Sequence, residues 1–533
     1  MRSSALGSRE SELSRRSFLA LSAAVVSLPC LDRMASMHPI LLGLAGDNPF
    51  TLGVASGDPT PTGVVLWTRL ALKPLEVDGG MPAESIELEW VVAHDEALIN
   101  VARKGKILAG ADMGHAVHVE VEGLEPDRWY FYGFRTRSSQ SPTGRTRTMP
   151  RVDASPERLK FAFASCHHFE QGFYSAYEQM AADSPDMVFF LGDYIYEYAE
   201  KPKTDEKDAR VRFHVGPKLQ QIGDYRRRHA QYRSDPLLQR AHATCPWWVT
   251  WDDHEVENNY ANLVSSLKDV DPIAFAQQRA NAYRAYYENM PLRPSAMPKG
   301  PDMTLYRRGQ FGKLLDFTVL DTRQYRTDQP NGDGHRQLND AALSPLNTIL
   351  GARQRNWLES SLVDSKATWN LLAQQVMMGL VAFRTKTEGE RTYSMDQWPG
   401  YTDERIKLMR FMADRKINNP IVITGDIHSN WVNDLRVDDR DSRSPVVGVE
   451  FVGTSISSGG AGTAVPKTLS NLMADNAGLR WHNAERGYVR CTVTPKTWKS
   501  DYIVVDSVLK PNGSTLVRKS FVVEAGRPGV QVS

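Results

Sequence analysis

Apolar and polar positions alternate in the first part of the chain, from Phe50 to about Pro150. Segments such as "GVVLWTRL", "SIELEWVVA" and "HAVHVEVEGL" alternate apolar and polar residues. This period of two is typical of strands that bury one face. Turn-forming stretches such as "SGDPTPTG" separate the segments. The pattern therefore predicts an all-β region at the start of the protein.

The aromatic segment "GLEPDRWYFYGFRT" narrows this prediction. A turn followed by a strand rich in tyrosine is similar to the tyrosine corner of fibronectin-type sandwiches. We therefore expect residues 46–150 to form a fibronectin-like β-sandwich. The Ser, Thr, Gly and Arg residues of 138–151 would close it.

From about Arg158 onward, apolar strands alternate with helical stretches. The expected strands are Leu159–Ala164, Met187–Leu191, Trp247–Trp251, Leu314–Leu320, Asn370–Gln374, Ile421–Thr424 and Val446–Val452. Helices are expected, among other places, at Gly172–Ala182, Phe275–Glu288, Ala352–Leu362 and Asp403–Asp414. Such alternation predicts a layered α/β domain over residues 151–533, with closing strands near the C-terminus.

The first 45 residues have the composition of an export signal. Arg15 and Arg16 precede a short apolar run over 20–28, and small residues follow at 44–46. A membrane-spanning helix needs about 20 apolar residues, more than this run offers. The paired arginines resemble a twin-arginine signal peptide. We therefore expect the twin-arginine export machinery to carry the protein to the periplasm or outside the cell, without an integral membrane segment in the mature chain.

Charge and cysteine content exclude several classes of protein. Lys and Arg total 64 against 63 Asp and Glu, which gives no reason to expect a nucleic-acid partner. Removal of the leader would leave Cys166, Cys245 and Cys491, too few for a disulfide framework. Cys245 and Cys491 could pair. At least one thiol then needs another role.

Side chains that bind metals follow four of the expected strands. The segments are "SCHHFEQG" from Ser165, "GDYIYEY" from Gly192, "DDHEVENN" from Asp252 and "GDIHSNW" from Gly425. Sites in α/β sheets lie beyond the carboxyl ends of strands, so these segments should meet. Their carboxylates would repel one another unless cations were bound between them. The pattern predicts a metal centre.

The kinds of ligand also indicate which metals bind. Thiolate, phenolate and imidazole together suit a transition metal, and phenolate favours ferric iron over zinc. Carboxylate and amide oxygens suit a harder second cation such as calcium, magnesium or manganese. We expect a mixed centre in which one aspartate bridges the two metals.

Two other kinds of active site do not fit the residues. "HEVEN" at His254–Asn258 lacks the second histidine of the zinc-protease helix. The Gly/Ser-rich segment Gly453–Gly462 lacks the frame of a nucleophile elbow. Its backbone could approach a phosphate, although a mobile loop is the simpler interpretation.

Taken together, the motifs resemble one enzyme family. "FASCHH", "LGDYIYEY", "TWDDHEVENN", "LDTRQYR" and "ITGDIHSNW", with "FTLGVASGDPTPTGVVLWTRL" and the twin-arginine leader, are similar to the alkaline phosphatase D (PhoD) family. That family belongs to the metallophosphoesterase group, which is related to purple acid phosphatases. The resemblance covers nearly the whole chain and implies a layered α/β/β/α catalytic domain.

The resemblance also implies a set of metal ligands. Ferric iron (Fe3+) would be bound by Cys166, Asp193, Tyr196 and His428, and calcium (Ca2+) or another divalent cation by Asp193, Asp253 and Asp426. Asn258 or Asn259 would add an oxygen donor on the calcium side. The sequence leaves open whether Asp252 or Asp253 is the ligand.

Two further residues are expected to act in catalysis. The resemblance implies that His254 contacts the phosphate or its leaving group. Arg323 or Arg326, after the strand Leu314–Leu320, would neutralise the phosphate, unless the arginine serves only as a structural salt bridge. Phosphoryl transfer would then proceed by in-line attack of a metal-bound hydroxide.

The expected function is an exported phosphatase or phosphodiesterase that acts on small organic phosphoesters. A phospholipase D-like enzyme acting on phospholipid head groups is an alternative with the same chemistry. A secreted binding protein with structural metals is an alternative of another class. Against the binding protein, His254 is not needed as a ligand, and structural sites are usually closed.

Overall fold

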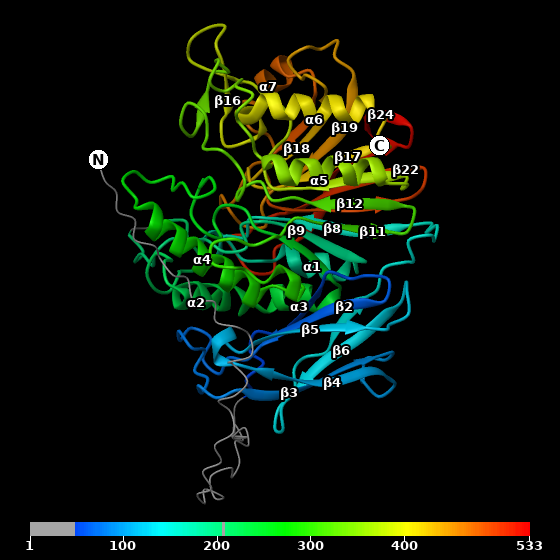
Figure 1. Ribbon diagram of the computed structural model, residues 1–533. Helices are drawn as coiled ribbons and strands as arrows, with labels where there is room; N and C mark the ends of the chain where they lie inside the picture. Colours follow the sequence, from blue (N-terminus) through cyan, green and yellow to red (C-terminus); the bar gives the residue numbers. More distant parts are fainter. Residues whose placement is uncertain (1–47, 205–207, 533) are drawn as a thin grey trace, which may run out of the picture. The chain divides into compact units, whose positions relative to one another are not determined.

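The computed structural model describes residues 48–204 and 208–532 (Figure 1). The export signal expected over 1–45 lies outside these residues. Within them the chain has the expected mixed architecture, with a β-rich N-terminal part and a layered α/β/β/α part. No helix in the described ranges is long and apolar enough to cross a membrane.

Two large sheets form the centre of the layered part. The first has ten strands in the order β24-β23-β22-β21-β8-β9-β10-β1-β2-β5. Its strands are β24 (Arg527–Val532), β23 (Thr515–Glu524), β22 (Thr497–Val505), β21 (Gly487–Val493), β8 (Leu159–Ala164), β9 (Met187–Leu191), β10 (Trp247–Thr250), β1 (Val54–Gly57), β2 (Gly63–Arg69) and β5 (Ala116–Glu122). The central strands β8, β9, β10 and β1 run parallel, so β8, β9 and β10 end at the same edge.

The second sheet has seven strands in the order β11-β12-β14-β17-β19-β18-β20. Its strands are β11 (Arg307–Phe311), β12 (Leu315–Val319), β14 (Trp369–Ala373), β17 (Pro420–Thr424), β19 (Val446–Val452), β18 (Asn430–Arg436) and β20 (Leu479–Asn483). Strands β12, β14, β17 and β19 run parallel. The sequence predicted seven strands in the layered domain, divided between the two sheets. All of them are present, with ends that differ from the prediction by at most one residue.

An apolar core holds the two sheets together. Phe189 of β9 meets Phe317 of β12 edge to face, with ring centroids 5.1 Å apart, and Phe161 of β8 packs behind it. These strands are buried on both faces, which explains their continuous apolar runs. The outer faces carry helices (Figure 1).

Helices cover both outer faces of the sheets. The ten-stranded sheet packs against α1 (Ala176–Ala182), α2 (Ile222–Arg233), α3 (Pro236–Thr244) and α4 (Pro272–Asn289). The seven-stranded sheet packs against α5 (Gly351–Asp364) and α6 (Thr402–Asp414). Shorter helices are α7 (Leu469–Asp475), η1 (Ala111–Met113), η2 (Phe169–Gln171), η3 (Pro294–Ala296) and η4 (Trp398–Tyr401).

Two helices begin three or four residues away from the expected position, for local reasons. Helix α4 begins three residues earlier than expected, because Asp271 caps it through the N–H of Ile273 and Pro272 occupies its first position. Helix α1 begins four residues later than expected, because Gly172 is extended and the chain before it forms the 3-10 turn η2.

The N-terminal part is a β-sandwich joined to the large sheet. Its second sheet has the order β4-β3-β6-β7, with β4 (Val101–Ala109), β3 (Ile86–Ala93), β6 (Trp129–Arg135) and β7 (Gly144–Arg147). The Tyr130 hydroxyl accepts a hydrogen bond from the N–H of Glu125 at 2.9 Å, the geometry of a tyrosine corner. Because Gly57 of β1 pairs with Trp247 of β10, one sheet runs through both parts of the protein. The domain boundary at residue 150 stays a prediction.

A small third element and the cysteines complete the fold. Strands β13 (His335–Arg336), β16 (Arg391–Ser394) and β15 (Phe383–Arg384) form a three-stranded sheet. Cys166, Cys245 and Cys491 are all free and buried. The prediction that Cys245 and Cys491 could form a disulfide is therefore wrong. Cys245 follows α3, whereas Cys491 lies within β21, where it contacts Ser500.

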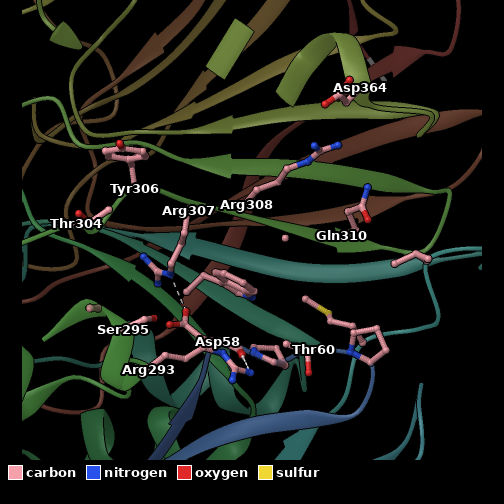
Figure 2. A pocket seen from close by; sticks show the side chains of 17 residues that line it. Asp58, Thr60, Arg293, Ser295, Thr304, Tyr306, Arg307, Arg308, Gln310 and Asp364 are labelled. Atoms are coloured by element: carbon pink, nitrogen blue, oxygen red, sulfur yellow. Dashed lines mark hydrogen bonds and ion pairs between the residues drawn. The ribbon is translucent and has the colours of Figure 1, made fainter. Parts of the chain in front are cut away.

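A pocket of about 610 Å³ opens near the point where β1 meets β10. Asp58 and Thr60 after β1, Arg293 before η3 and the β11 residues 307–310 contribute to its wall (Figure 2). Trp248 of β10 also lines it. None of the expected metal ligands does.

Candidate metal centre

The loops after β8 and β9 are hydrogen-bonded to each other. The N–H of Cys166 donates to the carbonyl of Gly192 at 3.1 Å, and the N–H of His167 donates to that of Asp193 at 3.3 Å. The second sheet joins at the same place, because Ser165 forms a parallel bridge with Ser455. Backbone contacts alone therefore hold the ends of the two sheets next to each other.

Four of the expected ligands have left-handed backbone conformations. The φ angles are 59° at Cys166, 56° at Asp193, 65° at Asp426 and 50° at His428. Residues other than glycine rarely adopt this region, and each instance costs about 1–3 kcal/mol. Such strain persists only where the surroundings hold it, and it is concentrated at functional sites.

The close packing of the loops after β9 and β10 requires a glycine at position 192. Its φ is 106°, and a Cβ atom there would lie 2.4 Å from the Cβ of Asp252. Only glycine therefore allows the loop after β9 to pass so close to the loop after β10.

The expected iron ligands lie together. Donor atoms of Cys166, Asp193 and His428 are all within 4.8 Å of one another. The Tyr196 hydroxyl donates to Oδ2 of Asp193 at 2.9 Å and lies 3.3 Å from Nε2 of His428. Thiol, carboxylate, phenol and imidazole thus share one small space.

The expected calcium ligands Asp193, Asp253 and Asp426 belong to two groups of side chains beside this space. Asp193, Asp253 and His254 make one, and Asp252, Asp253 and Asp426 make the other, again with donor atoms within 4.8 Å. Asp193 therefore belongs to the iron-side group and to one of these, as a bridging ligand would. Both Asp252 and Asp253 are at the site.

The two asparagines are engaged at its edge. The backbone N–H of Asn258 donates to Glu197 at 3.1 Å. Asn259 donates its backbone N–H to Oδ2 of Asp253 at 2.6 Å and its side-chain amide to Asp333. A role for the Asn258 side chain as an oxygen donor stays a prediction.

Three buried carboxylate oxygens fit a site for bound cations. Oδ1 of Asp193, Oδ2 of Asp252 and Oδ1 of Asp253 are buried and have no hydrogen-bond partner among the described residues. A buried anionic oxygen without a hydrogen-bond partner costs several kcal/mol, at least as much as the loss of a charge-assisted hydrogen bond. Cations bound between these carboxylates would remove that cost, so the residues fit a metal centre.

The protonation states agree with this interpretation. Burial raises the pKa of the Cys166 thiol well above its usual value, and the neighbouring Asp193 raises it further. Burial and Asp193 raise the pKa of the Tyr196 phenol in the same way. Burial also raises the pKa of Asp193 itself. Without cations these groups would stay protonated, whereas a bound metal stabilises the deprotonated forms.

His428 is set up as a neutral ligand. Burial and the positive charge of Arg486 lower the pKa of its imidazole to about 3. The ring is therefore neutral at physiological pH and can offer a nitrogen lone pair to a metal.

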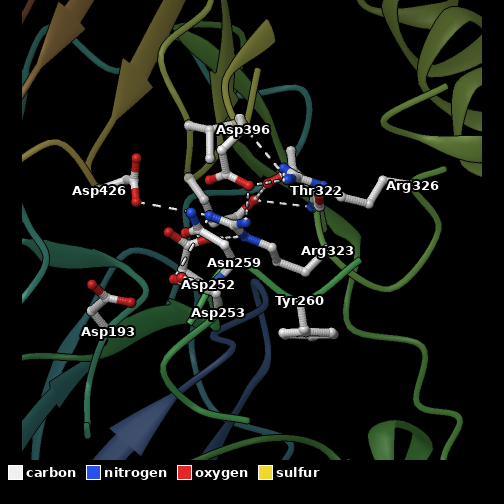
Figure 3. A network of polar contacts seen from close by, with 12 residues as sticks. Asp193, Asp252, Asp253, Asn259, Tyr260, Thr322, Arg323, Arg326, Asp396 and Asp426 are labelled. Carbon is white, nitrogen blue, oxygen red and sulfur yellow. Dashed lines mark hydrogen bonds and ion pairs between the residues drawn. The ribbon is translucent and has the colours of Figure 1, made fainter. Parts of the chain in front are cut away.

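Arg323 lies among the carboxylates (Figure 3). Its fully buried guanidinium donates to Asp252 and to Asp396 at 2.7 Å, and Nη2 is 3.7 Å from Asp253 and 3.8 Å from Asp426. Burial alone would lower its pKa, but Asp252 and Asp396 raise it well above the usual value. Arg326 also donates to Asp396 at 2.8 Å. It lies further than Arg323 from Asp252 and Asp253 (Figure 3).

His254 is held by a carboxylate that sequence reasoning missed. Its Nδ1 is 2.7 Å from Oε2 of Glu197, and its ring centroid is 4.2 Å from that of Tyr196. Burial opposes the charged imidazole, but Glu197, Asp253 and Asp193 raise the pKa of His254 well above its usual value. The charged imidazole can therefore donate a proton.

Four contacts were missed for different reasons. Glu197 stands within the candidate ligand segment "GDYIYEY", and this place was a signal that could have been used. Gln397, which donates to Asp426, and Asp396 come from the loop before η4, which follows no strand of either large sheet. Ser458, in the Gly/Ser-rich segment, is 2.7 Å from the Tyr196 hydroxyl, so that segment forms part of the wall.

Comparisons with known proteins show which family the chain resembles. A family model described as "PhoD-like phosphatase" matches residues 161–502, and one described as "PhoD-like phosphatase, N-terminal domain" matches residues 43–150. Alkaline phosphatase D of Bacillus subtilis (strain 168) is 47% identical over 468 residues, which cover 88% of this chain and 79% of that protein.

A solved structure has the same fold. The structure described as "Structure of PhoD" superposes with a TM-score of 0.88 at 47% identity, over 91% of this chain and 92% of the other.

Proposed function

The chain belongs to the PhoD-like phosphatase family and is a phosphoric ester hydrolase, and on that premise we propose that it is an exported, metal-dependent phosphatase or phosphodiesterase. The observation that best supports the metal dependence is the set of three carboxylate oxygens on Asp193, Asp252 and Asp253 that have no partner in the described part of the chain. They converge with a thiol, a phenol and an imidazole at the ends of parallel strands.

We assign ferric iron to Cys166, Asp193, Tyr196 and His428 because a phenolate and a thiolate suit this ion. Calcium, or another divalent cation that prefers oxygen ligands, would be held by Asp193, Asp253 and Asp426, with Asn258 as a further donor. When bound, the cations would neutralise phosphate oxygens and lower the pKa of the attacking water.

His254 has the role of proton donor to the leaving oxygen. Glu197 holds Nδ1, so the other ring nitrogen is free to face the substrate. The negative charge of Glu197 keeps the imidazole protonated until the leaving oxygen accepts the proton. Attack by water in line with the leaving group requires no covalent protein intermediate.

Arg323 supports the site by holding the carboxylates. Its contacts with Asp252 and Asp396 orient the acidic groups, and its charge lowers their mutual repulsion. The third guanidinium nitrogen, Nη2, has no hydrogen-bond partner among the described residues. We therefore propose that Arg323 positions the aspartates through its other two nitrogens and donates Nη2 to a phosphate oxygen.

The test of the enzyme is a substrate panel with matched variants. We expect the purified protein to hydrolyse p-nitrophenyl phosphate or bis-p-nitrophenyl phosphate, and His254→Ala to abolish turnover while iron and calcium contents stay at the parent values. Turnover at the parent rate in His254→Ala would refute the role of His254. Turnover that survives complete removal of metals would refute metal dependence.

The same panel separates the alternatives. Release of the head group from phosphatidylcholine at a rate above those of both nitrophenyl esters would favour the phospholipase D-like enzyme. A protein that retains metals but hydrolyses none of the three substrates would favour the secreted binding protein. Against the binding protein stands the His254–Glu197 pair, which a purely structural site does not need.

Export is a separate part of the proposal. Deleting residues 1–45 should leave the protein in the cytoplasm, and replacing Arg15 and Arg16 by lysine should have the same effect. Export of the double-lysine variant at the parent level would refute the twin-arginine route.

A further inference from the structure

The pocket near the junction of β1 and β10 has the features of a ligand site that is separate from the metal centre. Its volume of about 610 Å³ is within the range of small-molecule sites, about 300–1,000 Å³. It is lined by the apolar side chains of Met149, Val152 and Trp248 and by prolines at 59 and 61. Charged side chains of β11 and of the segment before η3 also line it.

Two hydrogen-bond donors in this wall have no partner within residues 48–204 and 208–532. Nη2 of Arg307 and Nε1 of Trp248 are buried and unpaired there. The two groups are close, because the guanidinium carbon of Arg307 is 5.2 Å from the Trp248 ring centroid. Unpaired buried donors cost about 1–3 kcal/mol each, so an acceptor bound beside them would be favoured.

The neighbouring arginines differ from Arg307 in their hydrogen-bond partners. Arg308 is bound by Asp316 through two hydrogen bonds, of 2.8 and 2.5 Å. Arg293 donates to Glu120 at 3.0 Å and to the carbonyl of Asp58 at 2.9 Å. Arg307 is held on one side only, by Oδ1 of Asp58 at 2.8 Å and the carbonyl of Leu305 at 3.0 Å.

Asp58 shows a second sign of a built site. Its φ is 44°, a left-handed conformation that costs about 1–3 kcal/mol in a residue with a side chain. This strained and buried residue orients the Arg307 guanidinium along the pocket wall (Figure 2). The carboxylate of Asp364 also lines the pocket, beyond Arg308, and would repel an anion there. The anionic end of a ligand should therefore lie at the Arg307 end.

We propose that this pocket binds a small amphipathic anion, with its apolar body against Met149, Val152 and the Trp248 ring and its anionic group at Arg307 and the Trp248 N–H. A sulfonate, carboxylate or phosphonate group has the required acceptors. The inference does not depend on the proposed phosphatase function.

The test is isothermal titration of the full-length, metal-loaded protein with naphthalene-2-sulfonate, which is an anion with an apolar body and no hydrolysable ester. We expect saturable binding at one site. Sulfate and 2-naphthol, which each offer only half of this chemistry, should bind at least about tenfold more weakly. Comparable binding of either one would contradict the amphipathic ligand class.

Variants locate the binding. Arg307→Met should weaken naphthalene-2-sulfonate binding at least about tenfold, whereas Arg308→Lys, the matched control whose partner is Asp316, should bind like the parent. Thr304→Trp should block the pocket with Arg307 intact, which covers the case in which Arg307→Met does not fold. All folded variants should keep the parent turnover.

The proposal is overturned if the parent does not bind the sulfonate, or if Thr304→Trp binds it as the parent does. It is also overturned if Arg308→Lys loses as much affinity as Arg307→Met. Competitive inhibition of ester hydrolysis by the sulfonate would place its binding at the metal centre instead and would equally refute it.

Discussion

The Tyr196 hydroxyl lies 3.3 Å from Nε2 of His428, although the two residues are 232 positions apart in the chain. Tyr196 follows β9 of one sheet, and His428 follows β17 of the other. The apolar core between the sheets therefore brings together two candidate ligands that no local segment could contribute.

Replacing Glu197 by Gln should impair turnover without removing metal. The glutamine side chain can still hydrogen-bond to His254, but it lacks the charge that keeps the imidazole protonated. We expect kcat to fall about 10- to 100-fold and the alkaline limb of the pH profile to move to lower pH. Metal content should stay at the parent value. Tyr198→Phe, on the exposed side of His254, is the control and should leave the profile in place.

Replacing Arg323 by Met should destabilise the fold. The variant leaves Asp252 and Asp396 buried without their cationic partner, a loss of about 3–5 kcal/mol in the free energy of unfolding. Urea unfolding of the metal-free protein measures it. Arg323→Lys, which keeps the charge but not both hydrogen bonds, should lose less. Equal stability of Arg323→Met and the parent would contradict the network of Figure 3.

Replacing Gly192 by Ala should disturb both stability and metal binding. The new Cβ would lie 2.4 Å from the Cβ of Asp252, at a φ of 106°. Gly389→Ala is a matched control, because its φ is 83° and no atom of the described residues lies within 4 Å of a Cβ there. Thermal unfolding should show only the cost of the strained backbone, about 1 kcal/mol, for the control, and a larger loss for Gly192→Ala. A control that is as unstable as Gly192→Ala would show that the close approach to Asp252 is unimportant.

His229 in α2 should make stability depend on pH. Burial lowers the pKa of its imidazole from 6.5 to about 3, and neither ring nitrogen has a hydrogen-bond partner in the part of the chain that the structure describes. Between these pH values the unfolded chain binds a proton that the folded protein does not. Stability from this source is thus complete above pH 6.5 and is lost as the pH falls toward 3. The full effect is on the order of a few kcal/mol.

The measurement is urea unfolding of the parent and His229→Leu between about pH 7.5 and about pH 4.5, a window that spans most of the expected loss. The variant should lose less stability on acidification than the parent does. Parallel curves for the two proteins would show that His229 does not contribute.

Much of the fold could be predicted from local patterns. The strands of the layered domain are buried on both faces, so their continuous apolar runs were visible in the sequence, and turn residues marked their ends. What the patterns could not show was the pairing of β1 with β10. A parallel pair between segments so far apart in the chain leaves no local trace, so the sandwich and the catalytic sheet were expected as separate units.

The candidate site divides in the same way. Cys166, Asp193, Tyr196, Asp253, Asp426 and His428 lie in the loops that follow strands, and the geometry of parallel sheets made their meeting predictable. Asp396 and Gln397 lie in an irregular loop before η4, and only tertiary packing brings them to Arg323 and Asp426. The orientation of His254 by Glu197 likewise required coordinates.

The central claim is that Cys166, Asp193, Tyr196 and His428 share a metal ion, and one measurement tests it most directly. Elemental analysis of the purified protein should be combined with its visible absorption spectrum. The account predicts about one iron per chain and an absorption band from phenolate or thiolate bound to ferric iron, with Tyr196→Phe and Cys166→Ser each altering the band. A colourless, iron-free protein that is fully active would contradict it.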